Sequence, residues 1–189
     1  MPVYLVGVNM QLRHFHLEFD IGTFVLSWNK QQKLCRIRLF SKDQKEIINS
    51  EIEKQLPLEL SFVIEKILDY FEKGKPLQDE LWNLLHIQDL TEFQKQVYKA
   101  TMVIPYGETR SYGWVAERVG HCLAGRAVGQ ALKKNPFPIL IPCHRVVSTQ
   151  GGVGGFLGKL GPEQPEVMLK QELIDLERDY VNPTFSFIA

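Results

Sequence analysis

A cysteine, a histidine and an arginine follow one another at Cys143, His144 and Arg145, directly after an apolar run at residues 139–141 that lies between two prolines. We expect that run to be a short buried strand, so that the three residues stand at a strand end. A cysteine attacks as the thiolate, and an adjacent base or cation lowers the pKa of a thiol. The motif could therefore hold a nucleophile, a metal ligand or half of a disulfide.

Cysteine usage argues against the disulfide and the metal. The three cysteines are an odd number and lie far apart, and no CxxC or CxxH pair occurs. His14 and His16 alternate on a probable strand, and we interpret them as solvated strand histidines rather than metal ligands. We expect neither a metal nor a cofactor.

The composition is that of an ordinary globular protein. The chain has 189 residues, 44% of them hydrophobic and 23% charged, with a formal net charge of zero, so one or two domains are expected. No apolar run reaches the roughly 20 residues that span a membrane. The N-terminus lacks the basic region of a signal peptide. These features predict a cytoplasmic protein without membrane contact, and we expect a monomer.

The N-terminal half has the pattern of a small sheet domain. Short runs rich in β-branched and aromatic residues predict strands over 3–8, 14–19, 22–28 and 34–40. Leu60, Ile64, Ile67 and Phe71 have helical spacing, and Gly74 would end that helix. Residues 1–88 are thus predicted to form a structural domain, an antiparallel sheet with a covering helix, and the segment from about 75 to 89 is predicted to be a linker.

Residues 89–189 have a mostly helical pattern, so the fold class is α+β. Thr91 and Gln94 form a capping box at the start of a first helix. Tyr112 begins a second helix that Gly120 closes, and a third spans 124–134. We expect the inner face of the third helix to carry Ala127, Val128, Ala131 and Leu132.

The second and third helices resemble a helix-turn-helix with a basic outer face. That face would carry Arg126, Gln130 and Lys133. Between residues 105 and 150, six Lys or Arg stand against two Glu, a local excess of four positive charges in a neutral chain. Such a patch is the electrostatic footprint of a DNA binder.

A nucleophilic Cys143 with His144 as its base would need a third group to orient the imidazole. An acid near the C-terminus could do this. Glu177 is one candidate, and Glu172 and Asp175 lie on the same stretch.

The motif IPCHRVV, preceded by RAVGQALKKNPFPIL and followed by GGVGGF, resembles the active-site region of the O6-alkylguanine-DNA alkyltransferase family. The resemblance continues upstream through IPYGETRSYGWVA and EFQKQVY and covers about residues 68–178. It implies that the protein transfers a methyl or small alkyl group irreversibly from O6 of guanine to its own cysteine, once per molecule. O4 of thymine would be a second site of attack by family analogy. The implied partner is double-stranded DNA that contains alkylated guanine, with the target nucleotide flipped out of the helix.

The resemblance also assigns roles to residues. It makes Cys143 the acceptor, His144 a water-linked base, Glu177 the group that stabilises the histidine, and Asn135 a brace of the active-site turn. Arg126 would enter the DNA stack in place of the extruded nucleotide. The full DNA-binding set is Arg126, Tyr112, Ala127, Gly129, Gln130, Lys133 and Arg145. The substrate pocket would be formed by Val153, Gly154, Gly155, Phe156 and Leu157.

The sequence departs from the family at two places. His121 and Cys122 replace a small polar residue and a proline at the turn between the two helices. The segment between Gly158 and Glu177 is longer than usual and contains two prolines, so the loop over the base is expected to be reshaped.

Other function classes stay open. A non-enzymatic relative would bind alkylated DNA without transfer, although such proteins lack the cysteine. A cysteine hydrolase would use Cys143 and His144 on acyl substrates and would need an oxyanion hole, for which the sequence has no distinct signal. A helix-turn-helix regulator would need a dimerisation segment, and none is visible.

Overall fold

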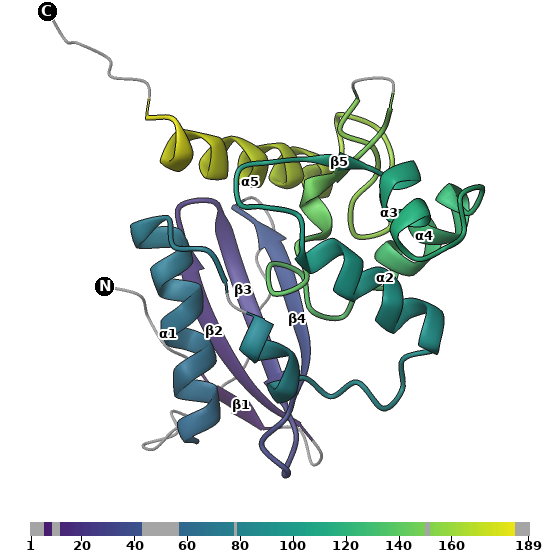
Figure 1. Cartoon of the computed structure of the whole chain (residues 1–189). Helices are drawn as coiled ribbons and strands as arrows, with labels where there is room; N and C mark the ends of the chain where they lie inside the picture. Colours follow the sequence, from purple (N-terminus) through teal and green to yellow (C-terminus); the bar gives the residue numbers. More distant parts are fainter. Residues whose placement is uncertain (1–5, 9–11, 43–56, 78, 150–151, 184–189) are drawn as a thin grey trace, which may run out of the picture. The chain divides into compact units, whose positions relative to one another are not determined.

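A four-stranded antiparallel sheet lies in the N-terminal part of the computed structural model, which describes residues 6–8, 12–42, 57–77, 79–149 and 152–183 (Figure 1). The strands lie in the order β1-β2-β3-β4. Their bounds are Val6–Val8 for β1, Arg13–Phe19 for β2, Gly22–Trp28 for β3 and Leu34–Ser41 for β4. The four predicted strands are confirmed, except that residues 3–5 of the first lie outside the described part.

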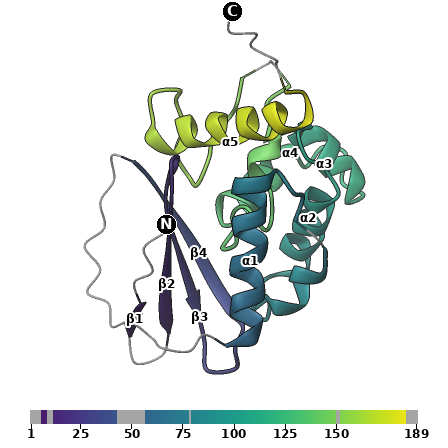
Figure 2. The ribbon, with the colours of Figure 1, turned by 90° about the vertical axis from the view of Figure 1, so that its left-hand side faces the viewer.

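Helix α1 (Leu58–Lys73) covers one face of this sheet, as Figure 2 shows with the sheet seen on edge. The ring centroid of Phe71 lies 4.2 Å from that of Phe19 on β2 and 5.0 Å from that of Phe24 on β3. Gly74 ends the helix in the left-handed conformation, with φ 61°, which glycine adopts without a steric penalty. The predicted covering helix and its end are confirmed.

The segment over residues 75–89 is not a free linker, and that interpretation was wrong. It contains the 3-10 helix Asp79–Leu84. Leu81 and Leu85 are buried, and the backbone N–H of His86 donates to the carbonyl of Leu34 at 2.8 Å. Burial of these two leucine side chains stabilises the segment against the core of the first unit.

The chain divides into two compact units. The first comprises Met1–Lys95 together with Pro136–Leu140, and the second comprises Gln96–Asn135 together with Ile141–Ala189. In the first unit the returning segment is bound to β4, because the Ile37 N–H donates to the carbonyl of Pro136 at 2.8 Å. The predicted boundary after residue 88 stays a prediction.

Helices dominate the second unit. They are α2 (Glu92–Met102, which begins in the first unit), α3 (Tyr112–Arg118), α4 (Gly125–Lys133) and α5 (Pro165–Val181). Strand β5 (Arg110–Ser111) pairs in parallel with β6 (Val146–Val147). The Tyr98 hydroxyl donates to the carbonyl of Ala131 at 2.9 Å and so joins α2 to α4. The α+β fold class is confirmed.

Two local predictions in this unit and its connection were wrong. Ala127 lies on the exposed face of α4, whereas Val128, Ala131 and Leu132 are buried as expected. Residues 139–141 do not form a strand: residues 139 and 140 form a turn, and Ile139 has φ 72°. That conformation is unusual for a β-branched residue. Among the described residues, no helix is long and apolar enough to cross a membrane.

The capping box at the start of α2 is present as predicted. The Thr91 N–H donates to Gln94 Oε1 at 3.0 Å, and the Gln94 N–H donates to Thr91 Oγ1 at 3.2 Å. The two side chains thus satisfy backbone donors that the first helical turn leaves without partners.

Replacing Thr91 with alanine should lower the free energy of unfolding by about 1 kcal/mol, because one of these hydrogen bonds is lost. Urea denaturation followed by circular dichroism measures the change. Thr149→Ala, in an exposed turn, is the matched control and should leave stability within about 0.5 kcal/mol of the wild type. Equal effects of the two substitutions would show that the cap contributes nothing.

Candidate active site

A cavity of about 400 Å³ lies in the second unit, between α4, the start of α3 and the segment after the glycine-rich stretch. Cys143 is among its lining residues although the residue is only 4% exposed. A reactant can therefore reach this thiol only by entering the cavity. The described lining residues are Tyr112, Gly125, Arg126, Gly129, Gln130, Leu132, Lys133, Cys143, Gly155, Phe156, Leu157, Gly158, Lys159 and Leu160.

The cysteine begins a short 3-10 turn, Cys143–Arg145, rather than ending a strand. Its N–H donates to the carbonyl of Ile141 at 2.7 Å. The side-chain amide of Asn135 donates both to that same carbonyl, at 3.0 Å, and to Cys143 Sγ, at 3.1 Å. One buried amide therefore fixes the backbone before the thiol and the sulfur itself.

The two residues after the cysteine converge on one carboxylate of α5. His144 Nε2 donates to Glu177 Oε1 at 2.8 Å. Arg145 Nε lies 3.1 and 3.0 Å from the two oxygens of Glu177, and Arg145 Nη2 donates to Oε1 at 2.9 Å. The Gly107 N–H donates to Oε2 at 2.9 Å. Glu172 and Asp175, the other candidate acids, are exposed on α5.

Burial and charge set the protonation of these groups. Burial raises the pKa of the Cys143 thiol, opposed by the Asn135 hydrogen bond and by the charge of Lys170. Burial lowers the pKa of His144, opposed by Glu177. Burial alone would raise the pKa of Glu177, but the hydrogen bonds from His144 and Arg145 and the charge of Arg145 hold it at about 2. The resting site thus holds a protonated thiol, a neutral imidazole and a carboxylate.

Lys170 is a polar residue of the site to which the sequence analysis gave no role. It is fully buried on α5, and its Nζ donates to the carbonyls of Val146 at 2.6 Å and Gly155 at 3.2 Å. Burial lowers the pKa of Lys170 to about 8. The signal was its spacing: Lys170, Leu173, Ile174 and Glu177 share one helical face, and a lysine on a buried face requires partners.

Most of the predicted DNA-binding residues line the cavity. Arg126, Gln130 and Lys133 are exposed on α4 and line the cavity. Tyr112 and Gly129 line it as well, and Gly129 lies next to the Tyr112 ring, where a Cβ atom would make an ordinary contact at 3.8 Å. Ala127 is exposed on the same helix but is not among the described lining residues.

Arg145, predicted to bind DNA, is buried among protein partners, so the structure gives its assignment to the DNA-binding set no support. The residue is 6% exposed. Besides its bonds to Glu177, its Nη1 donates to the carbonyl of Ile104 at 2.7 Å, and its guanidinium lies 5.5 Å from the ring centroid of Tyr106. The guanidinium is thus held by a buried carboxylate and a backbone carbonyl.

The cavity contains only part of the predicted substrate pocket. Gly155, Phe156 and Leu157 line the cavity, but the described lining residues do not include Val153 or Gly154. Gly154 instead packs against Tyr112, because a Cβ atom there would lie 3.2 Å from the tyrosine hydroxyl. The lining extends further along the chain than predicted, through Gly158, Lys159 and Leu160.

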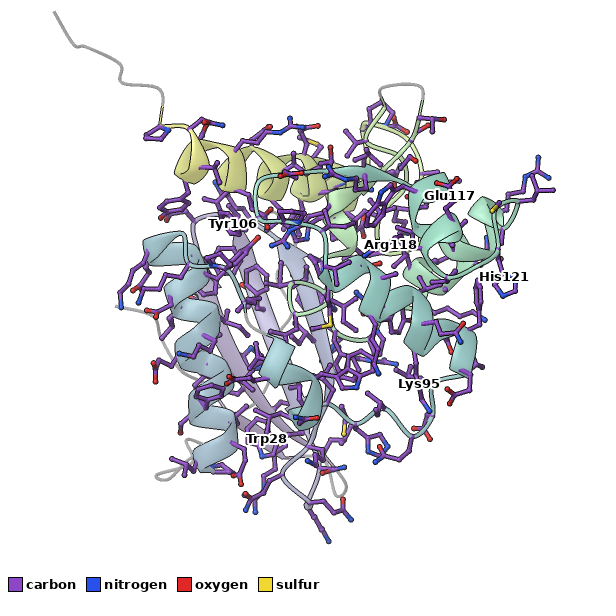
Figure 3. All side chains as sticks on the ribbon, in the orientation of Figure 1. Trp28, Lys95, Tyr106, Glu117, Arg118 and His121 are labelled. Carbon is purple, nitrogen blue, oxygen red and sulfur yellow. The ribbon has the colours of Figure 1, made fainter. Side chains whose placement is uncertain are left out.

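No group of three or more His, Cys, Asp or Glu side chains suited to a metal occurs among the described residues. His14 Nδ1 lies 2.8 Å from Ser27 Oγ. His16 is 6% exposed, so its interpretation as a solvated histidine was wrong. His121 and Cys122 are exposed at the turn between α3 and α4, from which His121 projects in Figure 3.

Known proteins share this sequence and fold. A family model described as 6-O-methylguanine DNA methyltransferase, DNA binding domain, matches residues 92–178. A methylated-DNA–protein-cysteine methyltransferase of Mycobacterium leprae is 47% identical over 91 residues, which are 48% of this chain and 51% of the relative. The chain thus spans about half the length of that relative. The constitutive methylated-DNA–protein-cysteine methyltransferase of Bacillus subtilis is 32% identical over 164 residues, 85% of this chain and 92% of the relative.

A solved structure agrees with these relatives. The crystal structure of Mycobacterium tuberculosis OGT in complex with DNA matches with a TM-score of 0.67 and 29% identity. The match covers 87% of this chain and 92% of that one.

Replacing Glu177 with glutamine should destabilise the second unit by about 3 kcal/mol or more at pH 7, because the buried Arg145 cation loses its counter-charge. The pKa of Glu177 is lowered from an ordinary 4.5 to about 2, so its stabilisation is complete above about pH 4.5 and is lost as the pH falls towards 2. The variant should therefore lose part of the acid dependence of unfolding. Denaturation curves from pH 7 to 2.5 measure both effects.

The matched control is Glu172→Gln, an exposed carboxylate on the same helix. It should leave both the stability at pH 7 and the acid dependence close to those of the wild type. Wild-type stability in the Glu177 variant would contradict a structural role for the buried carboxylate.

Proposed function

Because the chain belongs to the methylated-DNA–protein-cysteine methyltransferase family, we propose that it repairs DNA by transferring a methyl or small alkyl group from O6 of guanine to its own Cys143. The observation that carries the proposal is the buried thiol that lines the cavity, held by Asn135 and followed by the imidazole that Glu177 orients. Exposed basic residues of α4 border the same cavity. One surface could thus bind DNA and present the thiol to a flipped base.

The transfer balances without a cofactor. A bond forms between Cys143 Sγ and the alkyl carbon as the bond between that carbon and O6 breaks. The thiol loses its proton, and guanine regains a hydrogen in its keto form. The product is a thioether, which thiol exchange cannot reverse, so each molecule acts once.

The residues around the thiol suit this displacement. The raised pKa of the Cys143 thiol means that a base must remove its proton as the reaction proceeds. The neutral His144 can accept it, either directly or through a water, and Glu177 would then stabilise the imidazolium. The charge of Lys170 and the Asn135 amide stabilise the developing thiolate.

DNA binding follows from the position of α4. Its small residues allow close approach to a duplex, and its cationic side chains would contact phosphates with little sequence preference. Flipping a nucleotide costs a few kcal/mol, and an inserted Arg126 would offset part of the lost stacking. We extend the proposal to a monomer acting in the reducing cytoplasm, since one chain holds both the thiol and the basic helix and a thiol nucleophile stays reduced there.

The first test is intact-protein and peptide mass spectrometry after incubation with duplex DNA that contains one O6-methylguanine. The wild type should gain a single methyl group on the Cys143 peptide. Cys143→Ser should gain none and still bind the duplex, because the sulfur lies below the cavity surface. Cys122→Ser removes an exposed thiol and should be alkylated like the wild type.

Each other outcome has a distinct meaning. Alkylation of the Cys143→Ser variant would show that the acceptor is misassigned. Tight binding without transfer by the wild type would favour the non-enzymatic relative. Failure of both would favour the hydrolase, which turnover of acyl esters would reveal.

Replacing Arg126 with alanine should slow repair of duplex DNA by at least tenfold and change the reaction with the free modified base by less than twofold. The free base needs no extrusion, so only the duplex reaction uses an inserted side chain. Rates of Cys143 alkylation measured on both substrates give the comparison. Lys134→Ala, an exposed cation at the C-terminal end of the same helix, controls for lost charge. Equal losses on both substrates would remove the extrusion role.

A further inference from the structure

The segment after the glycine-rich stretch brings an uncovered leucine to the cavity. Leu160 lines the cavity, yet its residue is 78% exposed. The wall around it is also apolar, with contributions from Leu132, Phe156 and Leu157. Leu160 therefore has much apolar surface that an occupant of the cavity could bury.

A tight turn fixes the position of this leucine. The backbone N–H of Phe156 donates to the carbonyl of Lys159 at 3.0 Å, and the N–H of Lys159 donates back to the carbonyl of Phe156 at 2.8 Å. Leu157 and Gly158, between them, have φ 47° and 87°. This pair of left-handed residues is typical of the two-residue turns that reverse a chain sharply.

The turn folds Leu160 back onto Gly155. A Cβ atom on Gly155 would lie 2.5 Å from Leu160 Cδ2 and 2.7 Å from the carbonyl oxygen of Lys159, so only glycine permits this approach. The carbonyl of Gly155 in turn accepts hydrogen bonds from the Tyr112 hydroxyl at 3.4 Å and from Lys170 Nζ at 3.2 Å. Leu160 is thus packed on the same backbone that the Tyr112 and Lys170 side chains hold.

The other side of the turn packs against Lys133 of α4. A Cβ atom on Gly158 would lie 3.1 Å from Lys133 Cε and 3.5 Å from Lys133 Cγ, so the aliphatic stem of this lysine lies over the turn. The turn is held between α4 and Gly155. Leu160 is therefore a fixed part of the cavity wall.

We infer that Leu160 determines which alkyl groups the protein accepts, by contacting the part of the substituent beyond its first carbon. The inference rests on the proposed function. The reacting carbon must reach the buried sulfur, so a longer chain must lie along the cavity wall. Among the apolar side chains of that wall, Leu160 has far more surface to bury than Phe156, which is 3% exposed. Leu160 therefore raises the rate of transfer of longer alkyl groups relative to the rate of methyl transfer.

The test compares transfer from two duplexes that differ only in carrying O6-methylguanine or O6-butylguanine. The readout is the ratio of the two second-order rate constants, butyl over methyl, measured by quenching and mass spectrometry. Leu160→Ser should lower this ratio about tenfold, the scale of one lost apolar contact in a hydrophobic pocket, because the butyl rate falls more than the methyl rate. Leu160→Met conserves volume and apolarity and should keep the wild-type ratio.

Leu123→Ser is the matched control, because Leu123 is fully exposed and is not among the described lining residues. It should leave the ratio unchanged. An unchanged ratio in Leu160→Ser, or an equal loss of the butyl and methyl rates, would overturn the inference. Methyl transfer by the wild type would still support the proposed function in that case. Absence of methyl transfer by the wild type would refute the proposed function itself.

Discussion

The buried carboxylate of Glu177 is the group on which the candidate active site depends. It accepts hydrogen bonds from His144 and Arg145 on the 3-10 turn and from the backbone N–H of Gly107. A buried carboxylate would take up a proton without such partners. Because Arg145 supplies a permanent counter-charge, the anion persists, and the imidazole of His144 keeps a fixed orientation. The same interactions join α5, the 3-10 turn and the segment before β5. The Glu177 carboxylate therefore both orients the histidine of the site and stabilises the packing of its unit.

Much of the fold could be predicted from the sequence because its signals are local. The strands of the first unit are short runs rich in β-branched and aromatic residues, α1 has a regular apolar stripe with Gly74 at its end, and Thr91 with Gln94 identifies the start of α2. The failures have a common cause. The fastening of residues 79–85 to the core and the turn at Ile139 are decided by contacts with residues distant in sequence, which periodicity does not report.

The site could be predicted in its members but less well in their roles. The resemblance named Glu177 and Asn135, and both lie within hydrogen-bonding distance of the residues that they were expected to support. Arg145 was assigned to DNA because an arginine in a basic stretch gives no indication of a carboxylate 32 residues away. The spacing of Lys170 places it on the buried face of α5, but the sequence does not identify the carbonyls of Val146 and Gly155 that its Nζ contacts. A charged side chain acquires its function from partners that only the folded chain supplies.

The depth of Cys143 has a consequence for the lifetime of the protein. Oxidation of a cysteine follows its thiolate character and its exposure, and this residue has a raised pKa and 4% exposure. Under the proposed function, a Cys143 thiol that peroxide has oxidised could no longer accept an alkyl group. Because the sulfur is protonated and buried, it is protected from oxidation until a substrate enters the cavity. The exposed Cys122 lacks the protection of burial, and oxidants would be expected to modify it first.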